Sequence, residues 1–246
     1  MLTRSYYSAT APDFLRASPT AVLGELVAHH TFAVDQNQRN AWQAEILHLQ
    51  EVANALTDSF FFLEFAIPRM GKRADAVIIS DGYVLVIEYK VGADNYQKHA
   101  IDQVLDYALD LKNFHEGSHS PTIVPILVAT KAPALPVEVQ SWADGVIRPI
   151  LANRETLLPA IQILRATSKS EPVDAEAWAA SSYKPTPTIV EAAQALYSGH
   201  DVRKISRSEA GADCFIGGRN AEGKAMAVGV KEKPDTIHLA NPLHAA

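Results

Sequence analysis

The spacing of apolar residues along the chain predicts three helices. Between residues 40 and 56, apolar side chains recur every three or four positions, which is the pattern of one buried helix face. The same spacing predicts a helix over residues 100–114, and residues 154–166 are expected to form another. One acid, Glu45, stands inside the first apolar stripe. A carboxylate there is costly unless it is paired or binds a metal, although at the margin of the stripe it could also reach solvent.

Short apolar runs between these helices predict the strands of a sheet. The runs cover residues 60–67, 76–79, 83–87, 123–129 and 145–150. The turn Ser80-Asp81-Gly82 joins the second and third runs, and Asp-Gly is a strong signal for a hairpin. Pro125 interrupts the fourth run and indicates an edge strand or a bulge. This order of helices and strands predicts an α/β fold with a central mixed β-sheet flanked by helices.

Composition changes near Ser168 and divides the chain into three parts. Residues 1–168 are expected to form the main domain. Residues 169–207 contain serine- and proline-rich stretches around one helix-capping signal, which predicts a linker with a short helix. Residues 208–246 are rich in glycine and charge, lack a clear period, and are expected to be poorly ordered.

The composition narrows the class of protein. The chain has 246 residues, 48% of them apolar, and can bury a sizeable core. A single cysteine, Cys214, excludes a disulfide within the chain and is typical of a reducing compartment, so a cytoplasmic location is expected. No apolar stretch approaches the roughly 20 residues of a membrane span. The net charge of −6 argues against a broad basic surface that coats nucleic acid, though a local basic site stays compatible with it.

The main candidate for chemistry is Asp75 together with the run Glu88-Tyr89-Lys90. Side chains alternate along a strand, so Glu88 and Lys90 face the same way, and the predicted hairpin can bring Asp75 beside them. Two carboxylates and an ammonium group at the end of an apolar hairpin are compatible with magnesium-dependent phosphodiester cleavage. The alternative is a cluster of salt bridges without catalytic chemistry.

Polar residues on either side of this motif are candidates for substrate contacts. Gln103 and Tyr107 are four residues apart on the predicted helix over 100–114, so they can present two polar groups to one place. Lys72 and Arg73 precede the hairpin acid and form the nearest basic group. The alternatives are a helix flank that faces water and a solvated loop.

The order of these motifs resembles the PD-(D/E)XK nuclease superfamily. A helix with an acid, an Asp-to-Glu-x-Lys hairpin and a Gln-x-x-x-Tyr helix follow one another, although Ala74 stands where the superfamily often has proline. Within that superfamily, the chain resembles one bacterial group in particular: the nuclease-like domain that precedes the helicase domain of Schlafen-type DNA/RNA helicase proteins. The resemblance covers roughly residues 35–205 and includes the segments Arg73-Ala74-Asp75-Ala76-Val77, Val86-Ile87-Glu88-Tyr89-Lys90 and Asp106-Tyr107-Ala108-Leu109-Asp110-Leu111.

The resemblance implies a restriction-endonuclease-like core and a metal-dependent nuclease. DNA is the expected substrate ahead of RNA, and defence or repair is the expected setting. The implied ligands of Mg²⁺, which Mn²⁺ could replace, are Asp75, Glu88 and the backbone carbonyl of Tyr89. Glu45 would hold a second metal or an outer-shell water, and Lys90 would orient the attacking water or offset phosphate charge. The residues expected to contact the substrate are Gln103, Tyr107, Arg73 and Lys72.

Two alternatives to a self-sufficient nuclease stay open. A chain with this fold could bind nucleic acid, or dock on a helicase, without cutting. A helicase partner is compatible with the resemblance because the matched region contains no helicase domain. A homodimer is also open, since many related nucleases cut both strands as dimers.

Overall fold

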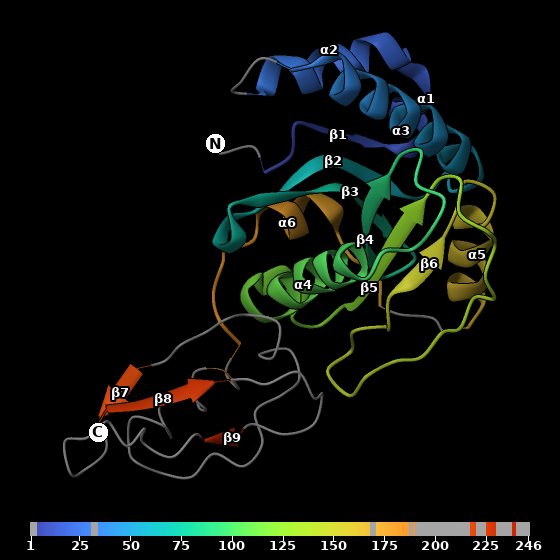
Figure 1. Cartoon of the computed structure of the whole chain (residues 1–246). Coiled ribbons are helices and arrows are strands. Elements are labelled where there is room, and N and C mark those ends of the chain that lie inside the picture. Colours follow the sequence, from blue (N-terminus) through green and yellow to red (C-terminus); the bar gives the residue numbers. More distant parts are fainter. Residues whose placement is uncertain are drawn as a thin grey trace.

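A six-stranded mixed sheet forms the centre of the computed structural model of this protein (Figure 1). The structure describes residues 4–30, 34–167 and 171–186, together with residue 189 and three short strands nearer the C-terminus. The strands of the central sheet follow one another in chain order, from β1 at one edge to β6 at the other.

Most elements occur where the sequence predicts them, with shifted ends, but the strand predicted over residues 145–150 is displaced, because β6 begins only at residue 150. The helices are α1 (Ala11–Arg16), α2 (Pro19–His29), α3 (Gln36–Ala55), α4 (Lys98–Phe114), α5 (Leu157–Thr167) and α6 (Ala175–Ala180), with short 3₁₀ helices at Pro68–Met70 and Glu116–Ser118. The strands are β1 (Tyr7–Thr10), β2 (Phe60–Ile67), β3 (Lys72–Ser80), β4 (Tyr83–Lys90), β5 (Thr122–Ala129) and β6 (Ile150–Ala152). The first forty residues, which the apolar pattern leaves unassigned, supply β1, α1 and α2.

The pairing of the strands confirms the predicted mixed sheet. β1, β2, β3 and β4 pair antiparallel, and the β3–β4 hairpin turns at Asp81-Gly82, as the sequence predicts. β5 lies parallel to β4, and β6 lies parallel to β5. The parallel step from β4 to β5 requires a crossover, which α4 provides.

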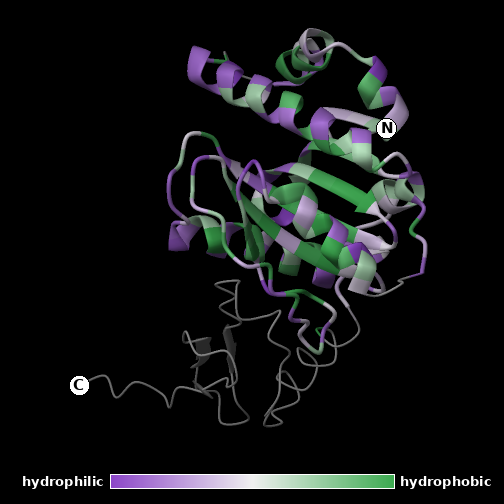
Figure 2. Cartoon of the chain, turned by 90° about the vertical axis from the view of Figure 1, so that its right-hand side faces the viewer, coloured by the Kyte–Doolittle hydropathy of each residue, from purple (hydrophilic) through white to green (hydrophobic). Residues whose placement is uncertain are grey.

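Helices cover both faces of the sheet and produce two apolar layers. One layer contains buried residues of α1, α2, α3 and α5, packed on alternate residues of the strands. The other layer contains buried residues of α4 and α6 on the opposite face. Figure 2 shows the strands as the most hydrophobic part of the molecule, with polar positions on the outer faces of the helices. Because helices bury both faces of the sheet, this part of the protein has three layers, with the sheet between two layers of helices.

Pro125 lies inside the sheet, so the predicted edge position is wrong, whereas the predicted bulge agrees with the pairing. Ile123 is opposite Val146 and Ile126 is opposite Ile150, so one extra residue lies on the side of β6 across Pro125. β5 sits between β4 and β6. Ile123 bonds through its N–H and C=O to Gly145 and Ile147, and N–H groups two residues apart on a strand face the same way. The nitrogen of Pro125 therefore faces the stretch before β6, where the ladder is interrupted, and its missing N–H breaks no regular pair.

The packed body continues beyond residue 168, where the main domain was expected to end. Trp178 of α6 is buried among Phe62 and Phe65 of the sheet. Tyr183 forms an isolated bridge with His115, so part of the expected linker is integrated into the fold.

The predicted C-terminal tail contains three short strands, although it was expected to be poorly ordered. β7 (Gly217–Arg219), β8 (Ala225–Gly229) and β9 (His238–Leu239) form an antiparallel sheet in that order. The rest of the predicted tail and nearly all of the predicted capping helix lie outside the described residues.

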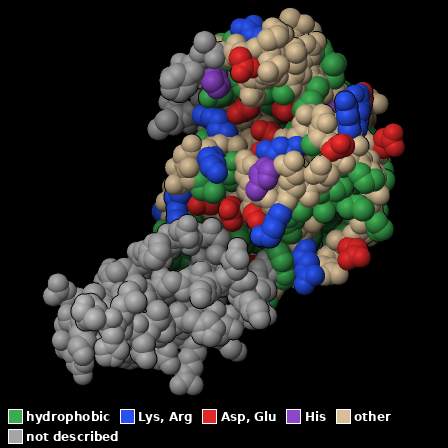
Figure 3. Space-filling view, in the orientation of Figure 1, with side chains coloured by type: hydrophobic (Ala, Val, Ile, Leu, Met, Phe, Trp, Pro, Cys, Tyr) green, Lys and Arg blue, Asp and Glu red, His purple; other side chains and the backbone are tan. Residues whose placement is uncertain are grey.

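Charges of both signs are interspersed over the part of the surface that Figure 3 displays. This distribution agrees with the mixed composition of the chain, which has 22 basic and 28 acidic residues. Within the described ranges, no helix is long and apolar enough to cross a membrane.

The buried His115 predicts an acid-dependent loss of stability. Its ring nitrogens lie 2.7 Å from the Ser118 Oγ and 2.9 Å from the Ser181 Oγ, and burial lowers its pKa from 6.5 to about 3. Between these two pKa values the unfolded chain binds a proton that the folded protein excludes. The free energy of unfolding should therefore fall as the pH drops through this window, with a contribution of up to about 1.4 kcal/mol per pH unit.

Urea unfolding of wild type and His115→Gln across this pH window tests the prediction. The variant should show a shallower loss of stability on acidification than wild type. Substitution of the exposed His99 by Gln is the control and should leave the wild-type slope unchanged. Equal slopes for all three proteins would contradict the role of His115.

Candidate functional site

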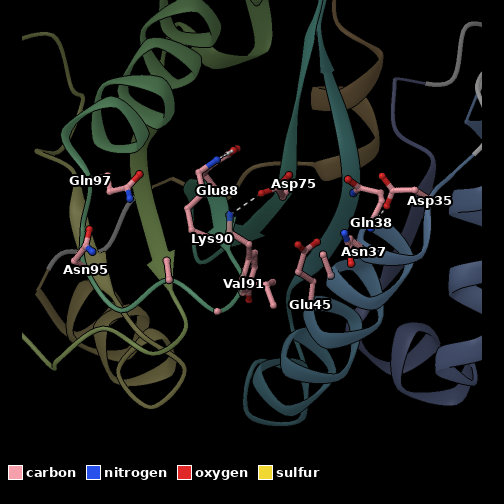
Figure 4. A pocket seen from close by; sticks show the side chains of 14 residues that line it. Asp35, Asn37, Gln38, Glu45, Asp75, Glu88, Lys90, Val91, Asn95 and Gln97 are labelled. Atoms are coloured by element: carbon pink, nitrogen blue, oxygen red, sulfur yellow. Dashed lines mark hydrogen bonds and ion pairs between the residues drawn. The ribbon is translucent and has the colours of Figure 1, made fainter.

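A pocket of about 800 Å³ opens at the end of the β3–β4 hairpin, and the expected acids meet there (Figure 4). Glu45, Asp75, Glu88 and Lys90 line it. The β3–β4 ladder runs from the turn to the pair Ala76–Ile87, so Asp75 and Glu88 come directly after the last paired residues. The separation of the two strands creates the space into which these side chains project.

Asp75 takes the place of the next ladder bond. Its Oδ2 accepts a hydrogen bond of 2.6 Å from the Tyr89 N–H, which would otherwise face the open strand end. The N–H and C=O of one strand residue point to the same side, so the Tyr89 carbonyl also faces β3 and the pocket. The carbonyl is thus on the side where the sequence predicts a metal ligand.

Glu88 and Lys90 face α4 and form one hydrogen-bonded network with it. The Lys90 Nζ lies 2.8 Å from the Glu88 Oε1 and 3.3 Å from the Gln103 Oε1. Gln103 donates through its Nε2 to the Glu88 Oε1 at 2.9 Å and to the Tyr107 hydroxyl at 2.7 Å. Gln103 and Tyr107 therefore present their polar groups to one place, as their spacing predicts, and Gln103 links them to the hairpin motif.

Glu45 approaches from the other face of the sheet. It lies on α3 and is 9% exposed, so of the two alternatives that the sequence left open the structure shows the buried one. Burial, reinforced by the charges of Glu64 and Glu88, raises its pKa to about 8. In Figure 4 its carboxyl group points toward Asp75.

The carboxylates of the site oppose one another's ionisation. Burial raises the pKa of Asp75 well above its usual value, and the charges of Glu45 and Glu88 raise it further. Burial also raises the pKa of Glu88, against the lowering effect of Lys90. A positive charge at the pocket would relieve this repulsion, because it favours the ionised form of every acid nearby.

The donor set fits a hard divalent cation. Asp75, Glu88 and the Tyr89 carbonyl offer oxygen atoms, which are the ligands that Mg²⁺ prefers. The Glu88 Oε2 is buried without a hydrogen-bond partner, so one acid oxygen is not committed to the protein. As the side chains of the described residues stand, no three His, Cys, Asp or Glu form a ready metal cage. Asp75 is turned to the Tyr89 N–H and Glu88 to Lys90, so full ligation requires rotation of these side chains.

The two basic candidates before the hairpin are placed differently. Lys72 is exposed and close enough for its charge to lower the pKa of Glu88. Arg73 donates to the carbonyl oxygens of Glu64 and Arg4, and its guanidinium stacks 3.9 Å from the ring centre of Tyr6. The structure therefore brings Lys72 near the acids and engages Arg73 in holding the N-terminal segment.

Glu64 is a further acid near the site that the sequence pattern did not single out, and it acts on the pocket acids through its charge without lining the pocket. It is 9% exposed, its Oε1 accepts a 2.6 Å bond from the Trp42 Nε1, and its charge raises the pKa of Glu45 and of Asp75. Its φ of +53° is rare for a residue with a side chain. The available signal was one acid inside the otherwise apolar run of residues 60–67.

The unusual backbone of Glu64 coincides with a break in strand alternation. Phe62 and Phe65 of β2 belong to the same apolar layer, as do Val77 and Ala74 of β3. Strict alternation would place residues three apart on opposite faces. The break at Glu64 and at the facing Asp75 lets both strands keep apolar side chains buried while two acids occupy the positions between them.

Comparisons of the chain with protein-family models, with curated proteins and with solved structures found no match.

Glu64→Gln should stabilise the protein. The change removes one of four mutually repelling buried acids, while the amide oxygen of Gln can still accept the Trp42 bond. We expect a gain of about 1 kcal/mol in the free energy of unfolding, which corresponds to a rise in Tm of roughly 2–4 °C. Thermal and urea unfolding measure it.

Two further variants make the comparison specific. Glu64→Ala leaves the Trp42 N–H without its acceptor and should lower stability by about 1–3 kcal/mol. Glu138→Gln removes an exposed acid and should change stability by less than about 0.5 kcal/mol. A loss of stability in Glu64→Gln would show that the charge itself holds the fold together.

Proposed function

We propose that this protein is a metal-dependent nuclease that hydrolyses phosphodiester bonds, with DNA as the expected substrate. The observation that carries the proposal is that Asp75, Glu88, Lys90 and Glu45 line one pocket. Behind the pocket wall, Gln103 bonds Glu88, Lys90 and Tyr107. A chance cluster of ion pairs has no reason to bring together all six of these residues, which the motif resemblance names. The order of the strands and the position of α4 support a restriction-endonuclease-like core.

Asp75, Glu88 and the Tyr89 carbonyl would hold a Mg²⁺ ion, and Glu45 would add a ligand or hold an outer-shell water. When bound, this ion supplies an activated water and offsets charge that develops on the phosphate. The raised pKa values of the acids support this assignment, because nearby positive charge lowers the cost of ionising them together.

Lys90 is the cation of the pocket that can reach a phosphate oxygen or the attacking water. Its side chain is 32% exposed and is held by Glu88 and Gln103, so its ammonium group is oriented before substrate arrives. Preorganisation of this kind costs no rearrangement during the reaction.

Gln103 and Tyr107 position the other residues. Tyr107 is 1% exposed and burial raises the pKa of its hydroxyl to about 12, so it stays protonated at neutral pH. Gln103 uses both ends of its amide within the network. These bonds support a positioning role in place of the direct substrate contact expected for both residues.

A non-cleaving module that binds nucleic acid or docks on a helicase is the second candidate. The observation in its favour is that the acids already have protein partners and form no ready metal cage within the described residues. A cytoplasmic setting and a helicase or second copy as partner stay predictions under either proposal.

Asp75→Asn or Lys90→Ala should reduce cleavage by about a hundredfold or more, because each removes a charge from the reacting phosphate or its metal. Cleavage of linear and circular DNA with Mg²⁺ or Mn²⁺ measures the effect. Lys98→Ala is the control, since Lys98 is exposed at the start of α4 and pairs with Asp102. Unchanged cleavage in both site variants would refute the assignment.

Mn²⁺ should raise the Tm of the wild-type protein, because a ligand that binds only the folded state stabilises it. At a hundred times Kd the gain is about 2.7 kcal/mol. Asp75→Asn should lose the gain, whereas Asp102→Asn, at an exposed acid, should keep it. A wild-type protein that Mn²⁺ does not stabilise would contradict the metal site and therefore the nuclease, and would leave the salt-bridge cluster or the non-cleaving module.

A further inference from the structure

Carboxamide side chains form the rim of the pocket on both sides of the acids. Asn37 and Gln38 come from the first turn of α3, and Asn95 and Gln97 come from the loop between β4 and α4. Figure 4 shows the two pairs on opposite sides of Asp75. All four residues are exposed, so their amide groups are accessible to a ligand.

The charge of the pocket lining is unsuited to holding a polyanion through its phosphates. Among the residues that line the pocket, Lys90 is the one basic side chain, against Asp35, Glu45, Asp75 and Glu88. Proteins that track a nucleic-acid backbone do so mainly with Lys and Arg. Without a bound cation, the lining repels phosphate.

Carboxamides are suited to the edges of bases. An amide offers both a donor and an acceptor, as base edges do, whereas a phosphate only accepts. In a duplex the Watson–Crick edges are already paired, but in a single strand they are free to bond protein groups.

The volume of the pocket also suits a single strand. Its volume of about 800 Å³ lies within the range of sites that enclose a small ligand, roughly 300–1,000 Å³. Such a space can take one or two nucleotides of one strand.

We propose that the pocket takes a single-stranded polynucleotide, whose bases bond the carboxamide rim on either side of the phosphate that the acids and Lys90 receive. The inference rests on the proposed nuclease function and names the form of its substrate. It requires a divalent cation for binding as well as for cleavage, because the lining carries more acids than bases. DNA and RNA strands share the base edges that the rim would contact.

Binding of labelled strands to the full chain tests the proposal. The probes are a fluorescein-labelled single-stranded DNA, its RNA counterpart, and the same DNA annealed to its complement, each with Ca²⁺, with Mg²⁺ or with EDTA. Fluorescence anisotropy measures Kd, and a denaturing gel of the same samples reports any cutting. We expect a single strand, of DNA or RNA, to bind at least about tenfold more tightly than the duplex, and only with a divalent cation.

A double variant isolates the rim. Gln38→Ala with Asn95→Ala removes one amide from each side and should weaken single-strand binding about thirtyfold, as for two lost hydrogen bonds. The first turn of α3 keeps its cap, because Asp35 accepts from the Gln38 backbone N–H. The matched control is Gln36→Ala with Gln140→Ala, which removes two exposed amides that do not line the pocket.

The outcomes separate this proposal from the function on which it rests. Duplex binding and cutting as strong as for the single strand would overturn the single-strand assignment and leave the nuclease intact. Equal Kd values for the rim variant and the control would overturn the role of the carboxamides. Wild type that neither binds nor cuts any probe would overturn both proposals.

Discussion

The burial of four carboxylates between two apolar layers is the constraint that shapes this end of the molecule. An unpaired buried charge costs several kcal/mol, and like charges at short range add to that cost. The acids lie at the point where β3 and β4 stop pairing, because backbone N–H groups without a ladder partner can donate hydrogen bonds to them there. The bond from the Tyr89 N–H to Asp75 is the central example, since it satisfies a strand end and an acid together.

The position of Glu64 adds a second cost at the same place. A residue with a side chain in the left-handed region is strained by on the order of 1–3 kcal/mol. The strain allows β2 to reverse its alternation, so that Phe65 and Ile67 are buried on the face opposite to Trp42. An acid that is both strained and buried is a poor choice for stability, and its position beside Glu45 supports a functional reason for it.

The two sides of the pocket have different characters. On the α4 side, Gln103 ties Glu88, Lys90 and Tyr107 into one network that fixes their orientation. On the α3 side, Glu45 is held mainly by its place in an apolar helix face. The α4 side can orient groups toward a phosphate, and the α3 side can supply negative charge for a cation. The two halves of the site therefore correspond to the two helix layers of the fold.

The local pattern of the sequence by itself determined the α/β class, the β3–β4 hairpin and α4, because periods of two and of three to four residues reflect burial directly. The pairing of Gln103 with Tyr107 was also readable, since residues four apart share a helix face. The burial of Glu45 was left open by the sequence, since a carboxylate at the margin of the apolar stripe could also reach solvent. The internal place of Pro125, the inclusion of Trp178 in the core and the engagement of Arg73 with Tyr6 depended on contacts between distant segments. Glu64 shows the limit most clearly: the strand pattern predicts regular alternation there. Only the packing of β2 against Trp42 and β3 decided that its backbone turns left-handed and that its carboxylate lies close enough to raise the pKa of Glu45 and of Asp75.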